Sequence, residues 1–198
     1  METQFGSARP WQADEASDTL AVQVITLVQP PASLDQALLR ETLAAVIAAP
    51  VARRVLVFGA ASGDWLPAGF DLMGQRGNDF GERVAAALAD AHASVPLPML
   101  LIRDDTLGIT ADMLTDAAWS LTSGEADAVF GPAYDGGFWL IGLRRPDRSL
   151  VVGIPEPGKD SAVGTGRLLL DRLATAGLRI ALAPRLEMAG PSERALRF

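Results

Sequence analysis

The sequence predicts a three-layer α/β/α fold, in which helices cover both faces of a mostly parallel sheet. Short β-branched runs alternate with amphipathic helical stretches through most of the chain. A chain of 198 residues, 49% of them hydrophobic, has the size of one α/β domain and can bury a full core. No internal repeat or linker interrupts it. We therefore expect a single domain over residues 20–198, preceded by a polar, acidic and disordered leader at residues 1–19.

Local signals set the expected elements. Ser33 and Gln36 form a capping box, Pro50 ends the helix that follows, Thr110 is an N-cap, and Gly177 follows a helix end. Strands are expected at residues 22–28, 55–58, 70–73, 99–102, 128–130, 138–143 and 180–183, and helices between Ser33 and Pro50, at 79–92, after Thr110 and at 166–176.

The strands at 128–130 and 138–143 follow each other without a helix between them. A direct connection of this kind joins antiparallel strands, so we expect a mixed sheet with one antiparallel strand near 138–143. The Asp135-Gly136 pair between them is a hairpin signal, because glycine accepts a positive φ.

Composition excludes several classes of function. The net charge of −7 argues against nucleic-acid binding, and no apolar run approaches the roughly 20 residues that span a bilayer. The chain has no cysteine, which excludes disulfides and thiolate metal sites and fits a cytoplasmic protein. We expect a small-molecule partner and neither nucleic acid nor membrane, and homo-oligomerisation stays open.

Three polar clusters fall where strands end, which is where open α/β sheets bind ligands. The first runs from Gln75 into a helix start and includes Asp79, Gly81 and Arg83. Its backbone N–H groups suit an anion, although a helix start capped by Asn78 or Asp79 accounts for the same residues.

The second cluster contains Asp104 and Asp105, directly after the strand that ends at Ile102. Carboxylates at this place are suited to Mg²⁺, which takes one or two carboxylates and completes its shell with water and phosphates. The alternative is that both are solvated turn residues.

The third cluster is Tyr134 followed by Asp135, Gly136 and Gly137. Paired glycines let a ligand approach the backbone while Asp135 holds it, whereas the structural alternative is the hairpin turn alone.

Together the clusters resemble a family of bacterial glycosyltransferase-like proteins, the radical-SAM/selenodomain-associated transferases, within the nucleotide-diphospho-sugar transferase superfamily. The resemblance covers about residues 70–145. It rests on Gln75 with residues 79–83, on residues 101–114, and above all on residues 127–143.

The resemblance implies a GT-A-like, Rossmann-like fold and a nucleotide or nucleotide-sugar ligand. It implies that Asp105 holds Mg²⁺ or Mn²⁺, that Asp105 and Asp135 are catalytic, and that Asp135 lies with Gly136 and Gly137 in the donor or acceptor pocket. Gln75, Asp79, Gly81 and Arg83 would surround the nucleotide.

The chain departs from the family pattern at three places. One is residues 106–108, where the proline and glycine that usually follow the metal aspartate are replaced. The family's phosphate loop carries lysines and an arginine, whereas residues 29–34 here carry no cation. The family's late Asp-x-Asp motif corresponds to residues 187–189, where Ala189 replaces the second carboxylate. Four cations from other loops are candidates to compensate: Arg103, Arg144, Arg145 and Lys159.

Three functions therefore compete. The first is a glycosyltransferase-like enzyme with a nucleotide-activated donor and impaired activity. The second is a non-catalytic descendant, or pseudoenzyme, that serves as a ligand sensor or partner subunit. The third is a nucleotidyltransferase of the guanylyltransferase kind.

Overall fold

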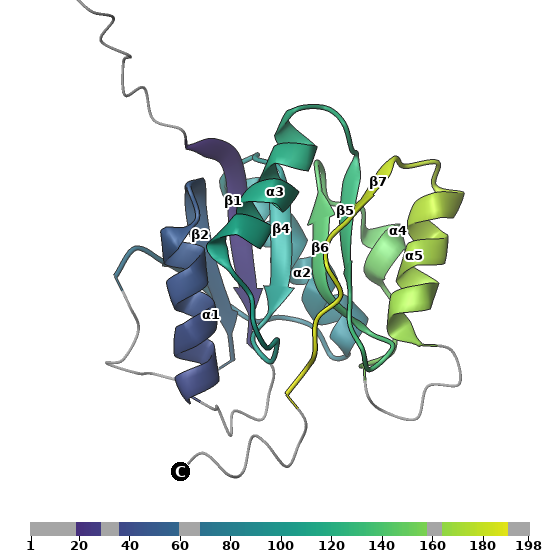
Figure 1. Ribbon diagram of the computed structural model, residues 1–198. Coiled ribbons are helices and arrows are strands. Elements are labelled where there is room, and N and C mark those ends of the chain that lie inside the picture. Colours follow the sequence, from purple (N-terminus) through teal and green to yellow (C-terminus); the bar gives the residue numbers. More distant parts are fainter. Residues whose placement is uncertain (1–18, 29–35, 60–67, 158–163, 190–198) are drawn as a thin grey trace, which may run out of the picture.

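The computed structural model describes residues 19–28, 36–59, 68–157 and 164–189, and these form one seven-stranded mixed sheet with its helices (Figure 1). Residues 1–18 of the expected leader, Ser33 and Lys159 lie outside the described residues. The strand order is β3-β2-β1-β4-β6-β5-β7. The strands are β1 (Leu20–Leu27), β2 (Val51–Phe58), β3 (Asp71–Gly74), β4 (Met99–Arg103), β5 (Ala128–Pro132), β6 (Phe138–Leu143) and β7 (Ile180–Leu182).

The β6 strand is antiparallel to both of its neighbours, β4 and β5. The other pairs in the sheet are parallel. The sequence prediction of a mixed sheet with an antiparallel strand near 138–143 is therefore confirmed.

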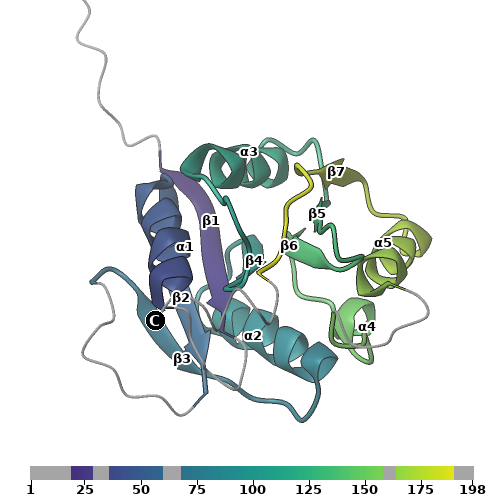
Figure 2. The same ribbon diagram turned by 60° about the horizontal axis from the view of Figure 1, so that its bottom comes forward.

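Helices cover both faces of the sheet, as predicted. The helices α1 (Gln36–Ala48) and α3 (Ala111–Thr122) lie on one face, and α2 (Phe80–Ser94), α4 (Arg148–Val151) and α5 (Thr165–Thr175) lie on the other (Figures 1 and 2). The short helix α4 was not predicted, because four residues are too few to show a helical period. Among the described residues, no helix has both the length and the apolar character needed to cross a bilayer.

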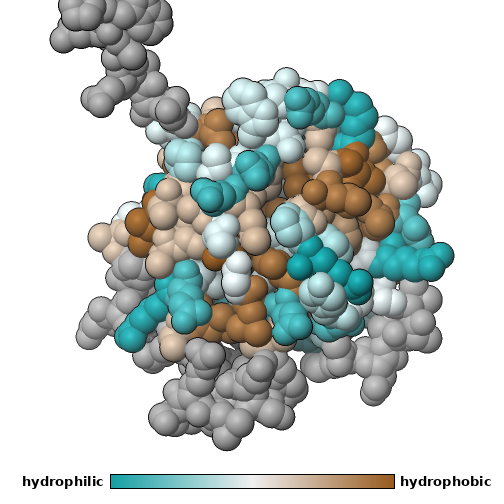
Figure 3. All heavy atoms as spheres, viewed as in Figure 1, coloured by the Kyte–Doolittle hydropathy of each residue, from teal (hydrophilic) through white to brown (hydrophobic). Residues whose placement is uncertain are grey.

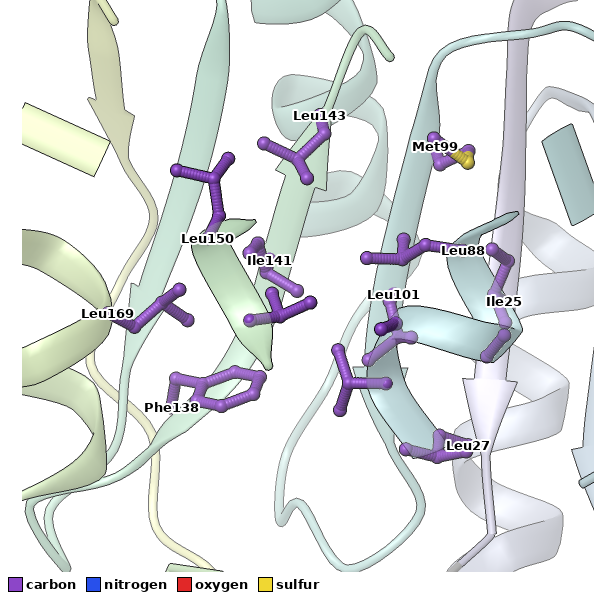
Figure 4. Close-up of a cluster of buried hydrophobic side chains, with 14 of the residues drawn as sticks. Ile25, Leu27, Leu88, Met99, Leu101, Phe138, Ile141, Leu143, Leu150 and Leu169 are labelled. Atoms are coloured by element: carbon purple, nitrogen blue, oxygen red, sulfur yellow. The ribbon is translucent and has the colours of Figure 1, made fainter. Parts of the chain in front are cut away.

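The core lies on both sides of the central strands. Along β1, Ile25 and Leu27 belong to the cluster beneath α2, whereas Val22 and Val24 face α1 and α3. Figure 4 shows the first cluster, in which side chains of α2, α4 and α5 meet those of β1, β4 and β6. Because both faces of β1 are buried, its sequence is mostly apolar with little alternation, and its two polar residues, Gln23 and Thr26, are buried as well.

The carboxyl ends of the parallel strands meet at one edge of the sheet. Leu27 pairs with Arg103 at the ends of β1 and β4, and β5 runs parallel to β4 because β6 separates them in the opposite direction. The loops that follow β4 and β5 therefore leave from the same edge. This is the edge turned toward the viewer in Figure 2.

The two outer strands leave hydrophobic side chains at the surface. Figure 3 shows hydrophobic surface over β7, whose Leu182 is 69% exposed. At the other side of the sheet, Leu72 of β3 is also exposed, but its neighbour Asp71 pairs with Arg53 at 2.6 Å. Charges on an edge strand discourage further strand pairing.

The N-cap of α3 gives a local test of the fold. Thr110 accepts a hydrogen bond from the backbone N–H of Met113 at 3.3 Å, as its sequence position predicted. Thr110→Ala should lower the free energy of unfolding by about 1 kcal/mol, because a backbone donor loses its partner. Urea denaturation measures this change.

Thr115 is the matched control in the same helix. Its hydroxyl only donates to the carbonyl of Ala111, which already belongs to the helix ladder. Thr115→Ala should therefore leave stability nearly unchanged, since alanine is the better helix former. Equal losses in the two variants would contradict the capping role.

Candidate functional site

A buried ion pair lies at the carboxyl end of β4. The Arg103 guanidinium donates from Nε to Asp105 Oδ1 at 3.0 Å and from Nη2 to Asp105 Oδ2 at 2.6 Å. Both side chains are only 6% exposed. The two parallel hydrogen bonds match the fork of the guanidinium to the carboxylate, which is the strongest geometry for such a pair. Asp105 is thus neutralised within its own loop.

The aromatic ring of Phe80, at the start of α2, lies next to two guanidinium groups. The central carbon of Arg103 is 6.0 Å from the ring centroid and that of Arg83 is 5.9 Å from it. Glu156 approaches Arg83, with Oε1 3.7 Å from Nη2. The site therefore holds both arginines in fixed places but balances them with carboxylates.

The turn between β5 and β6 comes to the same place. Asp135 is exposed, and its Oδ1 accepts a hydrogen bond from the N–H of Gly137 at 2.8 Å. Gly136 has a φ of 81°, which the sequence predicted for this turn. A Cβ on Gly137 would stand 3.4 Å from Arg103 Nη1 and 2.9 Å from Asp135 Oδ1. Asp135 and the Arg103–Asp105 pair therefore share one site.

The start of α5 rests directly on this turn. The N–H of Gly166 donates to the carbonyl of Gly136 at 3.0 Å, so the turn caps the helix. A Cβ on Gly166 would lie 2.2 Å from the Gly137 carbonyl oxygen, and one on Gly164 would lie 2.6 Å from that of Gly136. Glycine is required at both places because the two backbones are in contact.

Residues 184–189, the C-terminal strap, tie the two loops together and cross the carboxyl edge of the sheet (Figure 1). Ala189 donates to the carbonyl of Asp105 at 2.8 Å, and Tyr134 donates to the carbonyl of Leu186 at 2.9 Å. The strap thus bonds the Asp105 loop with one end and the loop before Asp135 with the other. Its Ala189 stands beside Asp105, where the sequence comparison with the family put the missing carboxylate.

The other predicted site residues that the structure describes make hydrogen bonds to the backbone or pack against neighbouring backbone. Gln75 donates to the carbonyl of Val28 at 3.0 Å, and Asp79 caps α2 by accepting from the N–H of Glu82 at 2.8 Å. Gly81 is buried, and a Cβ there would lie 2.5 Å from the carbonyl of Val151. Asp104 is half-buried, and its N–H donates to Leu27 at 3.3 Å. Their predicted ligand roles remain predictions.

Of the compensating cations that the structure describes, Arg103, Arg144 and Arg145, only one lies at the site. Arg103 lies at the site, but Arg144 and Arg145 follow the end of β6, which runs toward the opposite edge. Arg144 donates to the carbonyl of Ala126 there, at 3.0 Å. Because β6 is antiparallel, the residues directly after it start from the edge opposite the carboxyl end of β4.

Sequence reasoning missed the contacts made by Phe80, Glu156 and the two glycines of α5. The spacing of Arg103 and Asp105 is no reliable signal, because residues 104 and 105 form a turn after the end of β4. The Gly164-Thr165-Gly166 spacing marks a close backbone approach. Nothing local indicates that Glu156 meets Arg83, 73 positions earlier in the chain.

The residues near Asp105 do not fit a divalent cation as they are arranged. Both carboxylate oxygens of Asp105 already accept from Arg103, and Ala189 offers only a methyl group. Within the described ranges, no group of three or more His, Cys, Asp or Glu residues is placed to hold a metal ion. A magnesium ion normally has at least one carboxylate to itself.

The contact between α5 and the turn can be tested by adding a methyl group at Gly166. Gly166→Ala should destabilise the protein by about 1–3 kcal/mol, because its methyl group would overlap the Gly137 carbonyl and push the helix away. Thermal denaturation measures the loss. Gly74→Ala is the control, since a Cβ at Gly74 meets nothing within 4 Å. If Gly166→Ala lowered stability no more than Gly74→Ala, the start of α5 would be able to move away from the turn at little cost.

The buried pair can be tested by removing one or both charges. Arg103→Gln should cost roughly 3–5 kcal/mol of unfolding free energy, because the Asp105 carboxylate stays buried without its guanidinium. The double variant with Asp105→Asn should recover most of that loss, since no charge remains. Chemical denaturation of both variants gives the comparison. If the double variant lost as much unfolding free energy as Arg103→Gln alone, the cost would not come from the unpaired buried charge of Asp105.

Solved structures of other proteins share this fold. A candidate nucleotide-diphospho-sugar transferase from Desulfovibrio desulfuricans is 18% identical, with a TM-score of 0.70 over 84% of this chain and 81% of its own. A Pyrobaculum calidifontis mannosyltransferase, solved with GDP-Man and Mn²⁺, is 18% identical with a TM-score of 0.55 over 87% of this chain and 58% of its own.

A third relative in fold is 2-C-methyl-D-erythritol 4-phosphate cytidylyltransferase from Thermus thermophilus. It is 14% identical, with a TM-score of 0.54 over 90% of this chain and 97% of its own. At these identities the likeness shows the fold, and the predicted GT-A-like architecture is confirmed.

A search of curated protein sequences found no match. A family model does match, over residues 33–156, which is more than half of the chain. The chain thus belongs to the bacterial family described as "Uncharacterized protein conserved in bacteria (DUF2064)".

Proposed function

We propose that this protein binds a nucleotide-activated sugar at the carboxyl edge of its sheet and acts as a glycosyltransferase-like enzyme. One observation carries the proposal: the Asp105 loop and the turn of Asp135 meet at one site, joined by Arg103 and the C-terminal strap. Ligand sites of open α/β sheets lie at this edge. The fold, which this chain shares with solved nucleotide-diphospho-sugar and mannosyl transferases, supports the proposal.

The arginines are suited to the phosphates of such a ligand. A guanidinium is charged at all physiological pH values and binds phosphate through paired donors. Arg83 and Arg103 are held against Phe80 and have little freedom to lose on binding. They share the site with three carboxylates, those of Asp105, Asp135 and Glu156. The predicted affinity for phosphate alone is therefore modest.

Asp135 is suited to the sugar or to the acceptor. It is exposed, its carboxylate can accept from hydroxyl groups, and a Cβ on the next residue, Gly136, would meet nothing nearer than 3.9 Å, so a ligand can come close to the backbone there. In the proposed transfer, an acceptor oxygen forms a bond to the anomeric carbon as the bond to the diphosphate breaks. The nucleoside diphosphate leaves with the electron pair, and Asp135 takes the proton of the acceptor hydroxyl.

A second candidate is the non-catalytic ligand sensor or partner subunit. The specific observation in its favour is the pairing of Arg103 with Asp105 beside Ala189, which leaves the predicted metal position without a fitting ligand set. The first candidate requires release of free sugar or transfer to an acceptor. Detection of donor turnover by the natural protein decides between the two.

Asp135→Asn tests the proposed ligand contact. An asparagine oxygen can still accept from the Gly137 N–H, so the turn should persist while the charge is lost. We expect calorimetric affinity for the best binder in a panel of nucleotide-sugars to fall by about tenfold or more, as one charge-assisted hydrogen bond is lost.

Asp147→Asn provides the matched control. Asp147 is also exposed and accepts from a nearby backbone N–H, that of Ser149, but it caps α4. Its variant should bind like the natural protein. If no nucleotide-sugar in the panel gives heat with the natural protein, the proposed function is rejected. Equal affinity for Asp135→Asn would remove Asp135 from the site.

A further inference from the structure

We propose that the guanidinium of Arg103 replaces the divalent cation at this site, so that the protein binds the diphosphate group of its ligand without a metal ion. The assignment of a diphosphate ligand rests on the proposed function. The exclusion of the metal rests on the described residues alone. Three features of the site support the metal-free interpretation: the occupied carboxylate, the absent second ligand and the donors that Arg103 keeps.

The first feature is the positive charge that already occupies the Asp105 carboxylate. A metal ion bound to Asp105 would stand about 2 Å from a carboxylate oxygen. Each of those oxygens already lies within 3.0 Å of an Arg103 nitrogen. Metal and guanidinium would therefore be close neighbours in a buried place, where the repulsion between like charges is poorly screened. One cation excludes the other.

The second feature is the absence of a second carboxylate on the strap beside Asp105. The strap hydrogen bond from Ala189 to the Asp105 carbonyl fixes residue 189 next to the Asp105 loop, and its side chain is a buried methyl group. Glu187, two residues earlier, is exposed, and its carbonyl accepts from the N–H of Leu107. The strap thus places residue 189 beside Asp105, where the family has its second carboxylate, but that residue is alanine and supplies no metal ligand.

The third feature is the set of N–H donors that Arg103 offers in place of a metal. Its five N–H groups include two on Asp105 and one that donates to the carbonyl of Phe138 at 3.3 Å. Two more have no partner among the described residues. Nη1 lies next to Gly137, where the side chain of Pro157 also packs. Asp105 holds the fork in one orientation, so its role is that of a positioning residue.

The metal is tested directly with Mn²⁺, whose free ion gives a paramagnetic resonance signal. The natural protein should leave that signal unchanged at millimolar Mn²⁺. A variant that combines Arg103→Gly with Ala189→Asp frees one carboxylate and adds another, and should bind Mn²⁺ at least about tenfold more tightly. Tight Mn²⁺ binding by the natural protein that Asp105→Asn abolishes would overturn the proposal, whether or not the double variant folds.

The ligand is tested with ADP, GDP, UDP and CDP as probes, titrated calorimetrically with EDTA and then with Mg²⁺. We expect the same affinity in both conditions. The variant with Arg103→Gln and Asp105→Asn, which keeps no buried charge, should bind about 10–100-fold more weakly. Arg179→Gln is the control, because Arg179 forms a similar pair with Asp127 next to the amino ends of β5 and β7 and should have no effect.

A gain in affinity of tenfold or more on adding Mg²⁺ would overturn the metal-free model. If none of the four diphosphates binds in either condition, the diphosphate assignment fails together with the proposed function. The Mn²⁺ titration then still decides whether Arg103 excludes the metal.

Discussion

The buried pair between Arg103 and Asp105 is the constraint on which the candidate site depends. It neutralises the carboxylate that would otherwise need a cation, and it fixes a guanidinium whose Nη1 faces the glycine turn after β5. Burial makes the pair costly to break from either side, because the remaining buried charge would lose both hydrogen bonds of the pair. The same pair that stabilises the loop therefore determines which ligands the loop accepts.

Backbone contacts, rather than side chains, bring the rest of the site together. The strap bonds the loops after β4 and β5, and the glycines of α5 rest on the turn of Asp135. Carbonyls and N–H groups that face each other this closely leave little room for movement, so the turn is held between the strap and the helix. A rigid turn lowers the entropic cost of placing a ligand against Asp135.

Much of this could be predicted from the sequence. The strands β1 and β4 are mostly apolar, the turn at Asp135-Gly136 follows from local chemistry, and the antiparallel strand follows from the missing helix. The same reasoning placed Asp105 and Asp135 at one edge. It could not predict that Arg103 would turn onto Asp105, because loop conformation decides between that contact and solvent. It also missed Glu156, whose partner Arg83 is close only after α2 and α4 have packed.

Anomalous diffraction from crystals soaked in Mn²⁺ and a nucleoside diphosphate tests the central claim most directly. We expect no anomalous peak beside Asp105, with Arg103 still bound to both carboxylate oxygens and in contact with a phosphate oxygen. A manganese peak about 2 Å from Asp105, with the Arg103 side chain displaced, would contradict it.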